Sequence, residues 1–168
     1  MNDTMTRYLA GLSNIADGMT LRPFLLPMVD RYSSQPITSA GLVINAGGAA
    51  FPKIGAADFY ACVQGVLVKI AAGTAMPALT GINAPAGGFN VACFFVDGAG
   101  VVTALGGTPA ATLGAVRFPQ FPVGKALVGY LIITNAGAFT GGTTALDTAT
   151  TVYVSPIGGG AFDPSVLV

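Results

Sequence analysis

The chain contains no histidine and no tryptophan, and all seven of its acidic residues are aspartates. Without histidine, one subunit cannot build a histidine-ligated metal site, a Ser-His-Asp triad or a Cys-His nucleophile. Two aspartates could still serve a glycosidase, but the seven are scattered and most stand in turn or terminal-segment sequences such as Asp97-Gly98 and Asp163-Pro164. The composition therefore argues against most familiar hydrolases and leaves a carboxylate-pair glycosidase as the enzyme class still open.

Phosphate-binding signatures are also missing. The Gly- and Thr-rich stretches GTAMPALTG and TGGTTALD lack the Gly-Lys-Ser/Thr ending of a phosphate-binding loop. Gly98-Ala99-Gly100 is followed by a β-type run, where a dinucleotide site would require a helix. We therefore expect these glycines to form turns.

Charge is scarce, at 8% of residues compared with roughly 25% in a typical soluble domain. Seven Lys and Arg residues balance the seven aspartates, so the net charge is zero and offers no attraction for nucleic acid or anionic lipid. The basic residues form no cluster along the chain. We expect neither a nucleic-acid nor a membrane partner, and a surface that is buried against other protein.

Long uninterrupted apolar runs do not occur. Residues 70–96 carry no charge, but glycine, proline and asparagine interrupt them too often for a spanning helix of roughly 20 apolar residues. The start, MNDTMTRYLAGLSNIADG, lacks the order of a secretory signal, which is a basic start followed by an apolar block. Cys62 and Cys93 have no CxxC spacing and lie in apolar runs, which favours buried free thiols over a disulfide.

The first 35 residues differ from the rest and are predicted to form an N-terminal arm, partly helical, that acts as an anchor or a strap. Its apolar residues fall into two groups, divided by glycines and by Pro23 and Pro27. The arm residues that we expect at an interface are Leu9, Leu12, Phe24, Leu25, Leu26 and Met28. Two interpretations stay open: the arm crosses its own domain, or it reaches a neighbouring subunit.

Residues 36–168 are predicted to form an antiparallel β-sandwich of jelly-roll type, because short β-type runs alternate with Gly, Pro, Asn and Asp. Residues 37–45 are the expected first strand. Gln64-Gly65 and the segment 97–100 each suit the turn of a hairpin. Residues 126–134 and 148–154 are expected to supply two further strands.

Two of these strands are apolar on both faces. In residues 126–134, strict alternation places Leu127, Leu131 and Ile133 on one side and Ala126, Val128, Tyr130 and Ile132 on the other. Residues 89–97 show the same property. A strand of this kind is central in a sandwich or covered by another subunit, and two of them favour a homo-oligomer, with a trimer preferred over a dimer.

The segment VRFPQFPVG, residues 116–124, interleaves Phe118 and Phe121 with two prolines and Arg117. Such an extended aromatic loop could stack on a sugar or pack on a partner. We favour packing on protein, and Phe118 and Phe121 complete the candidate interface.

The order of these segments resembles small β-rich virion proteins of tailed bacteriophages, of the head-decoration and head-fibre type. The likeness covers roughly residues 40–155. It rests on the Val63-Gln64-Gly65-Val66 hairpin, the Phe95-Val96-Asp97-Gly98-Ala99-Gly100 hairpin and the strand at Gly129-Tyr130-Leu131-Ile132 that runs into FTGGTTALD. The resemblance implies a non-enzymatic subunit of the particle, with no cofactor, no metal and no catalytic residues.

We therefore expect a virion structural protein, made in the bacterial host cytoplasm and acting as a capsid decoration, cement or head-fibre subunit. Its partners would be further copies of itself and the major capsid protein or other virion proteins, with the arm as the attachment. The alternative is a receptor-binding fibre or tail component that recognises host surface glycans through the loop at residues 116–123.

Overall fold

A computed structural model describes residues 33–157 of the 168-residue chain. The regular elements of this part are β-strands and one short 3-10 turn. The strands are β1 (Ser34–Pro36), β2 (Val43–Ile44), β3 (Pro52–Lys53), β4 (Phe59–Val63), β5 (Val66–Ile70), β6 (Phe89–Val96), β7 (Val102–Gly106), β8 (Ala126–Thr134) and β9 (Thr150–Val154); the turn η1 is Leu113–Ala115.

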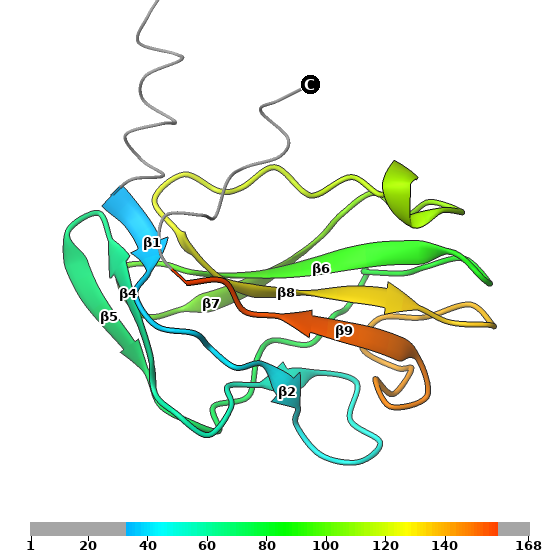
Figure 1. Cartoon of the computed structure of the whole chain (residues 1–168), viewed down its shortest axis with the longest axis horizontal. Coiled ribbons are helices and arrows are strands. Elements are labelled where there is room, and N and C mark those ends of the chain that lie inside the picture. Colours follow the sequence, from blue (N-terminus) through cyan, green and yellow to red (C-terminus); the bar gives the residue numbers. More distant parts are fainter. Residues whose placement is uncertain (1–32, 158–168) are drawn as a thin grey trace, which may run out of the picture.

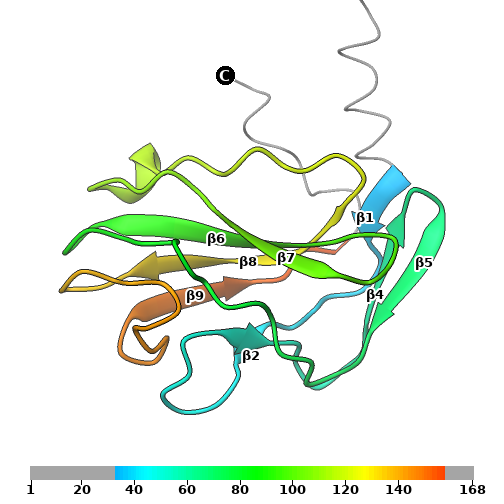
Figure 2. The ribbon, with the colours of Figure 1, turned by 180° about the vertical axis from the view of Figure 1, so that it is seen from behind.

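The strands form three antiparallel sheets, with orders β1-β4-β5, β2-β3 and β7-β6-β8-β9. The three-stranded sheet lies across one end of the four-stranded sheet, where β1 and β4 contact β8 (Figure 1). The view from behind shows the same arrangement, with β2 below the larger sheet (Figure 2). The predicted all-β class with antiparallel sheets is therefore confirmed, while the helical arm lies outside the described residues.

Both predicted hairpins are present. Gln64 and Gly65 join β4 to β5 with φ of 50° and 83°, the two successive positive values of a type I′ turn. Between β6 and β7, the Asp97 carboxylate accepts hydrogen bonds from the N–H groups of Ala99 and Val101, both at 3.0 Å. Gly100 completes that turn with φ of 81°.

The predicted first strand, residues 37–45, is wrong in its extent. The strand β1 ends at Pro36, before this range, and within the range only the two residues of β2 form a strand. The chain between β1 and β2 turns away from the three-stranded sheet. Thr38 ends the β1–β4 ladder because its hydroxyl accepts the N–H of Tyr60 at 2.8 Å and donates to the carbonyl of Asp58. Gly41, with φ of 53°, then takes a left-handed conformation that a continuous strand does not allow.

A β-bulge in β8 overturns the predicted division of its faces. Phe94 pairs with Gly129 but the next residue, Phe95, pairs with Leu127, so Val128 has no partner on β6. The extra residue reverses the alternation. As a result Ala126 and Val128 share a core with Leu131 and Ile133, while Leu127 faces the opposite side with Tyr130.

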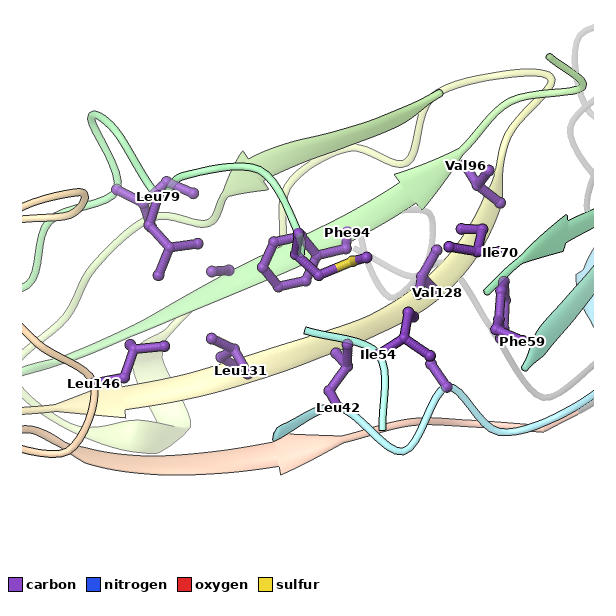
Figure 3. Packing of buried hydrophobic residues seen from close by; sticks show 14 of the residues in the cluster. Leu42, Ile54, Phe59, Ile70, Leu79, Phe94, Val96, Val128, Leu131 and Leu146 are labelled. Carbon is purple, nitrogen blue, oxygen red and sulfur yellow. The ribbon is translucent and has the colours of Figure 1, made fainter. Parts of the chain in front are cut away.

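The main core fills the space between the four-stranded sheet, the three-stranded sheet and the segments around β2 and β3. Figure 3 shows Phe94 from β6 and Leu131 from β8 pointing toward Ile54 and Leu79, which belong to the covering segments. All four of these side chains are fully buried. Phe59 and Ile70 bring the three-stranded sheet into the same cluster.

A second, smaller core lies on the other face of the four-stranded sheet. Its buried members are Val91, Cys93, Phe95, Phe121 and Leu127. Here the covering layer is the connection between β7 and β8, which runs back over the sheet (Figure 1). The same chain therefore covers both apolar faces of β6 and β8, and their composition no longer requires a second subunit.

Candidate interaction surface

Three turns meet at one end of the molecule, which we call the turn end: residues 64–66, 97–101 and 122–125. A Cβ atom placed on Gly124 would lie 3.2 Å from the Gln64 amide nitrogen, and one on Gly100 would lie 3.8 Å from Val68 of β5. Lys125 links the turn at 122–125 to the hairpin of β6 and β7. Its ammonium donates to the Thr103 hydroxyl at 3.2 Å and lies 3.9 Å from an Asp97 oxygen. Short local turns thus place segments distant in sequence side by side.

Large apolar side chains project from this end. Val66, Val101 and Val123 are 50%, 56% and 76% exposed, one from each of the three turns. Exposed apolar residues are normal when scattered singly, but a group of them marks a contact surface. The partly buried Lys125 and Asp97 lie beside them and balance each other's charge.

The outer face of the three-stranded sheet adjoins the turn end. Strand register places Gln35, Cys62 and Leu67 in one row across it, and Ile37, Tyr60 and Lys69 in the next, because Ile37 donates its N–H to the Tyr60 carbonyl. Leu67 is 67% and Ile37 is 49% exposed. The opposite side chains of these strands, such as Ala61 and Val68, enter the main core.

One ion pair closes the far side of that face. The Lys69 ammonium lies 2.7 Å from an Asp58 oxygen and 5.8 Å from the centre of the Tyr60 ring. Lys69, followed by the N–H of Ala72, holds the pKa of the Asp58 carboxyl below its ordinary value. The same carboxylate raises the pKa of Lys69. The positive charge of this face is therefore locally neutralised.

Of the predicted interface residues, the structure describes Phe118 and Phe121 and does not bring them into one exposed cluster. Phe121 is only 4% exposed and packs edge-on against Phe95, with ring centres 4.8 Å apart. Phe118 is half-buried and packs edge-on against Tyr130 at 5.1 Å. Little of Phe121 is thus available to a partner, whereas part of Phe118 is. Leu9, Leu12, Phe24, Leu25, Leu26 and Met28 lie outside the described residues.

The aspartates and cysteines of residues 33–157 are the side chains to consider for metal binding or catalysis. Between residues 33 and 157, no three His, Cys, Asp or Glu side chains lie close enough to hold a metal ion. The aspartates of this part stabilise local structure: Asp58 and Asp97 as described above, and Asp147 by accepting the N–H of Gly48 at 2.8 Å. Neither cysteine forms a disulfide: Cys62 is half-buried and Cys93 is fully buried.

A shallow hollow lies beside β7 and is lined partly by Thr80, Asn83 and Asn90. Asn90 is almost fully buried, donates to the Asn83 carbonyl at 2.7 Å and accepts the N–H of Val91 at 2.8 Å. The Asn83 side chain accepts the N–H of Gly141 at 3.0 Å. These amides hold the loops together, and the hollow offers no buried polar group that lacks a partner.

Comparison of the chain with protein-family models, with curated proteins and with solved structures finds no match. Among residues 33–157 there is no helix long and apolar enough to cross a membrane.

Sequence reasoning missed the exposed residues of the turn end and of the sheet face. These residues lie within apolar runs or next to turn glycines, so in the sequence they look like core residues: Val66, Leu67, Val101 and Val123. One signal was available, because each lies within three residues of a glycine in a turn. A residue next to a turn lies at the end of a sheet, beyond the side chains that form the core, and is therefore exposed.

Proposed function

We propose that the chain is a structural subunit of a tailed-bacteriophage virion, of the capsid-decoration, cement or head-fibre type. It acts by packing apolar surface against other protein, as a homo-oligomer with three subunits favoured over two. The N-terminal arm attaches it to the major capsid protein or another virion protein. The resemblance in segment order supplies the virion context, and the surface of the molecule supplies the mode of action.

The observation that carries the proposal is the apolar turn end. Val66, Val101 and Val123 project into solvent from rigid turns, on a chain with few charges and no net charge. Covering such side chains contributes roughly 25 cal/mol per Å² of apolar area. Because the turns are pinned by the Asp97 and Lys125 contacts, little conformational entropy is lost when a partner packs on them.

Two further properties suit a packing subunit. Both core clusters are completed within one chain, so the subunit has a full hydrophobic core before it assembles. The exposed groups are valine and leucine side chains whose contacts depend on shape and on burial. A protein of this kind stabilises a shell by adding contacts, with no bond made or broken.

The half-exposed Phe118–Tyr130 pair favours a second candidate, a receptor-binding fibre or tail component that stacks host glycans on an aromatic face. Glycan-array binding that is lost in Phe118→Ala would support it. Phe121→Ala does not test this candidate, because Phe121 lies in the core and its loss would disturb the whole domain.

The proposed function is tested on purified phage particles that carry the gene for this chain. Mass spectrometry should find the chain at a copy number near a simple fraction of the capsid protein, and imaging should place it on the particle surface. Deleting residues 1–32, which keeps β1, should abolish attachment while the β domain still folds. Absence of the chain from the particles would overturn the proposal, and full occupancy by the deletion variant would remove the arm as anchor.

A further inference from the structure

The outer face of the three-stranded sheet is apolar at the side that borders the turn end. It consists of Gln35, Ile37, Tyr60, Cys62, Leu67 and Lys69, with Lys69 paired to Asp58. Leu67 and Ile37 are largely exposed, and Tyr60 and Cys62 are half-buried between them. A sheet with one face in the core commonly shows polar residues on the other. This face departs from that pattern, since four of its six residues are apolar or aromatic.

The point where the chain enters the domain suggests what covers it. The described residues begin at Ser33, whose carbonyl accepts the N–H of Gln64 at 2.8 Å, beside the turn that joins β4 to β5. β1 is an edge strand of the same sheet (Figure 1). The 32 residues that precede Ser33 are therefore tethered at the rim of the face.

The nearest part of that segment has matching chemistry. Residues 20–32, TLRPFLLPMVDRY, carry Phe24, Leu25, Leu26, Met28 and Val29 within six positions. Its charges are Arg22, Asp30 and Arg31, which flank the apolar group.

The tether is also long enough. Leu67 lies two strands from β1, about 10 Å at the usual strand spacing. The five Cα–Cα steps from Met28 to Ser33 can span up to about 17 Å.

We propose that residues 20–32 dock on the outer face of the three-stranded sheet of their own chain, with the group Phe24–Val29 covering Ile37, Cys62 and Leu67. A segment tethered at the rim has an effective concentration of roughly millimolar at its target, so modest apolar burial suffices. The inference does not depend on the virion function. It leaves residues 1–19, with Leu9 and Leu12, to contact other proteins.

Cys62 provides a built-in probe, because its half-buried thiol lies in the middle of the face while Cys93 is fully buried and reports only global unfolding. The experiment measures the rate at which a small alkylating reagent modifies Cys62 in the full-length protein. Leu25→Lys/Leu26→Lys should raise that rate about tenfold, because the thiol loses its cover. The matched control, Leu9→Lys/Leu12→Lys, should leave it unchanged. Equal rates in all three proteins would overturn the proposal.

A second measurement assigns the segment to its own chain. Single cysteines are placed in turn at positions 24–29 and oxidised at high dilution, so that a bond to Cys62 forms only where the two Cα atoms lie within about 7 Å. We expect at least one position to give a disulfide within a single chain, seen as a monomer on a non-reducing gel. Disulfides that join two chains, or none at any position, would overturn the assignment.

Discussion

Ser34 shows how one residue of the first strand departs from an otherwise satisfied interior. It is 3% exposed, and among residues 33–157 its hydroxyl is the buried side-chain oxygen or nitrogen that has no hydrogen-bond partner. A buried polar group without a partner costs about 1–3 kcal/mol. Ser34 therefore lowers stability at the point where the chain enters the sheet.

We predict that Ser34→Ala raises the free energy of unfolding by about 1 kcal/mol, because it removes an unsatisfied hydroxyl and leaves no large void. Urea denaturation of the full chain measures this change. Ser39→Ala is the matched control: the Ser39 hydroxyl donates to the Ser155 carbonyl and accepts the N–H of Gly41, so its loss should lower stability. Destabilisation of both variants would show that Ser34 has a partner.

Phe118 and Phe121 differ in energetic role despite their similar sequence surroundings. Phe121→Ala should lower the free energy of unfolding by about 3–5 kcal/mol, because it opens a cavity beneath the Phe95 ring. Phe118→Ala should cost about 1–2 kcal/mol, since the ring is half-exposed and loses mainly its contact with Tyr130. Thermal unfolding of the two variants in parallel checks the order, and equal losses would contradict it.

The sequence pattern predicted that both phenylalanines pack on a partner protein, whereas Phe121 packs against Phe95 of its own chain. An apolar side chain in an extended loop has the same sequence signal whether its cover is its own sheet or a partner. The buried Phe121 and the exposed Val123 are two positions apart, and only the path of the connection over β6 and β8 separates them. That path depends on long-range contacts, which no local pattern encodes.

At the scale of elements, the hairpins were the most predictable part of the fold. Gln64-Gly65 and the 97–100 turn join strands of five to eight residues, and local turn chemistry decides their pairing. The strands β1, β2 and β3 have only two or three residues each: β1 exists because the distant β4 pairs with it, and β2 and β3 pair only with each other. The bulge in β8 was equally inaccessible, because register is a property of two strands together.

The turn glycines give a prediction at this scale. Gly65→Ala should lower the free energy of unfolding by about 1 kcal/mol: Gly65 has φ of 83°, and a Cβ there meets no atom within 4 Å, so the cost is purely conformational. Gly98→Ala in the other hairpin is the control, because Gly98 has equal space without a positive φ. It should leave stability unchanged or slightly higher. Chemical denaturation of both variants measures the difference, and equal effects would argue against a type I′ turn at Gln64-Gly65.

Gly129, next to the bulge, gives a second prediction. A Cβ at this position would lie 2.6 Å from the Val154 carbonyl oxygen and 2.7 Å from a Leu42 methyl group, so the β9 backbone and the Leu42 side chain would both have to move. Gly129→Ala should therefore destabilise the domain by about 1–3 kcal/mol. Hydrogen exchange should show the loss centred on β8 and β9, and an unperturbed β9 would contradict the packing described.

In the whole molecule, the doubly apolar strands β6 and β8 give no support to an oligomer. The same chain covers both faces of β6 and β8, so those strands explain the core and leave the oligomer unaddressed. Two exposed apolar surfaces are then candidates for contact: the turn end, and the outer face of the three-stranded sheet. The first is where we place contacts between subunits, and the second is where we place residues 20–32.

The structure also shows which N-terminal deletion can test the role of the arm without disturbing the three-stranded sheet. Removing residues 1–35 would take away Ser34 and Gln35, which pair with Val63 and Cys62 in the three-stranded sheet. Removing residues 1–32 keeps that ladder intact. Any loss of assembly can then be assigned to the removed segment, provided that circular dichroism shows an unchanged β signal.

Sedimentation equilibrium tests the proposal that the chain acts by packing its turn end against other copies. The full-length protein should sediment at three times the 16.7 kDa of one chain. Val101→Lys/Val123→Lys should reduce it to a monomer that keeps its β circular-dichroism signal, because both side chains are exposed in the subunit. Val43→Lys/Val152→Lys, which changes exposed valines elsewhere, should leave the trimer intact. A wild-type chain that remains monomeric up to its solubility limit, or an oligomer that survives Val101→Lys/Val123→Lys, would contradict the account.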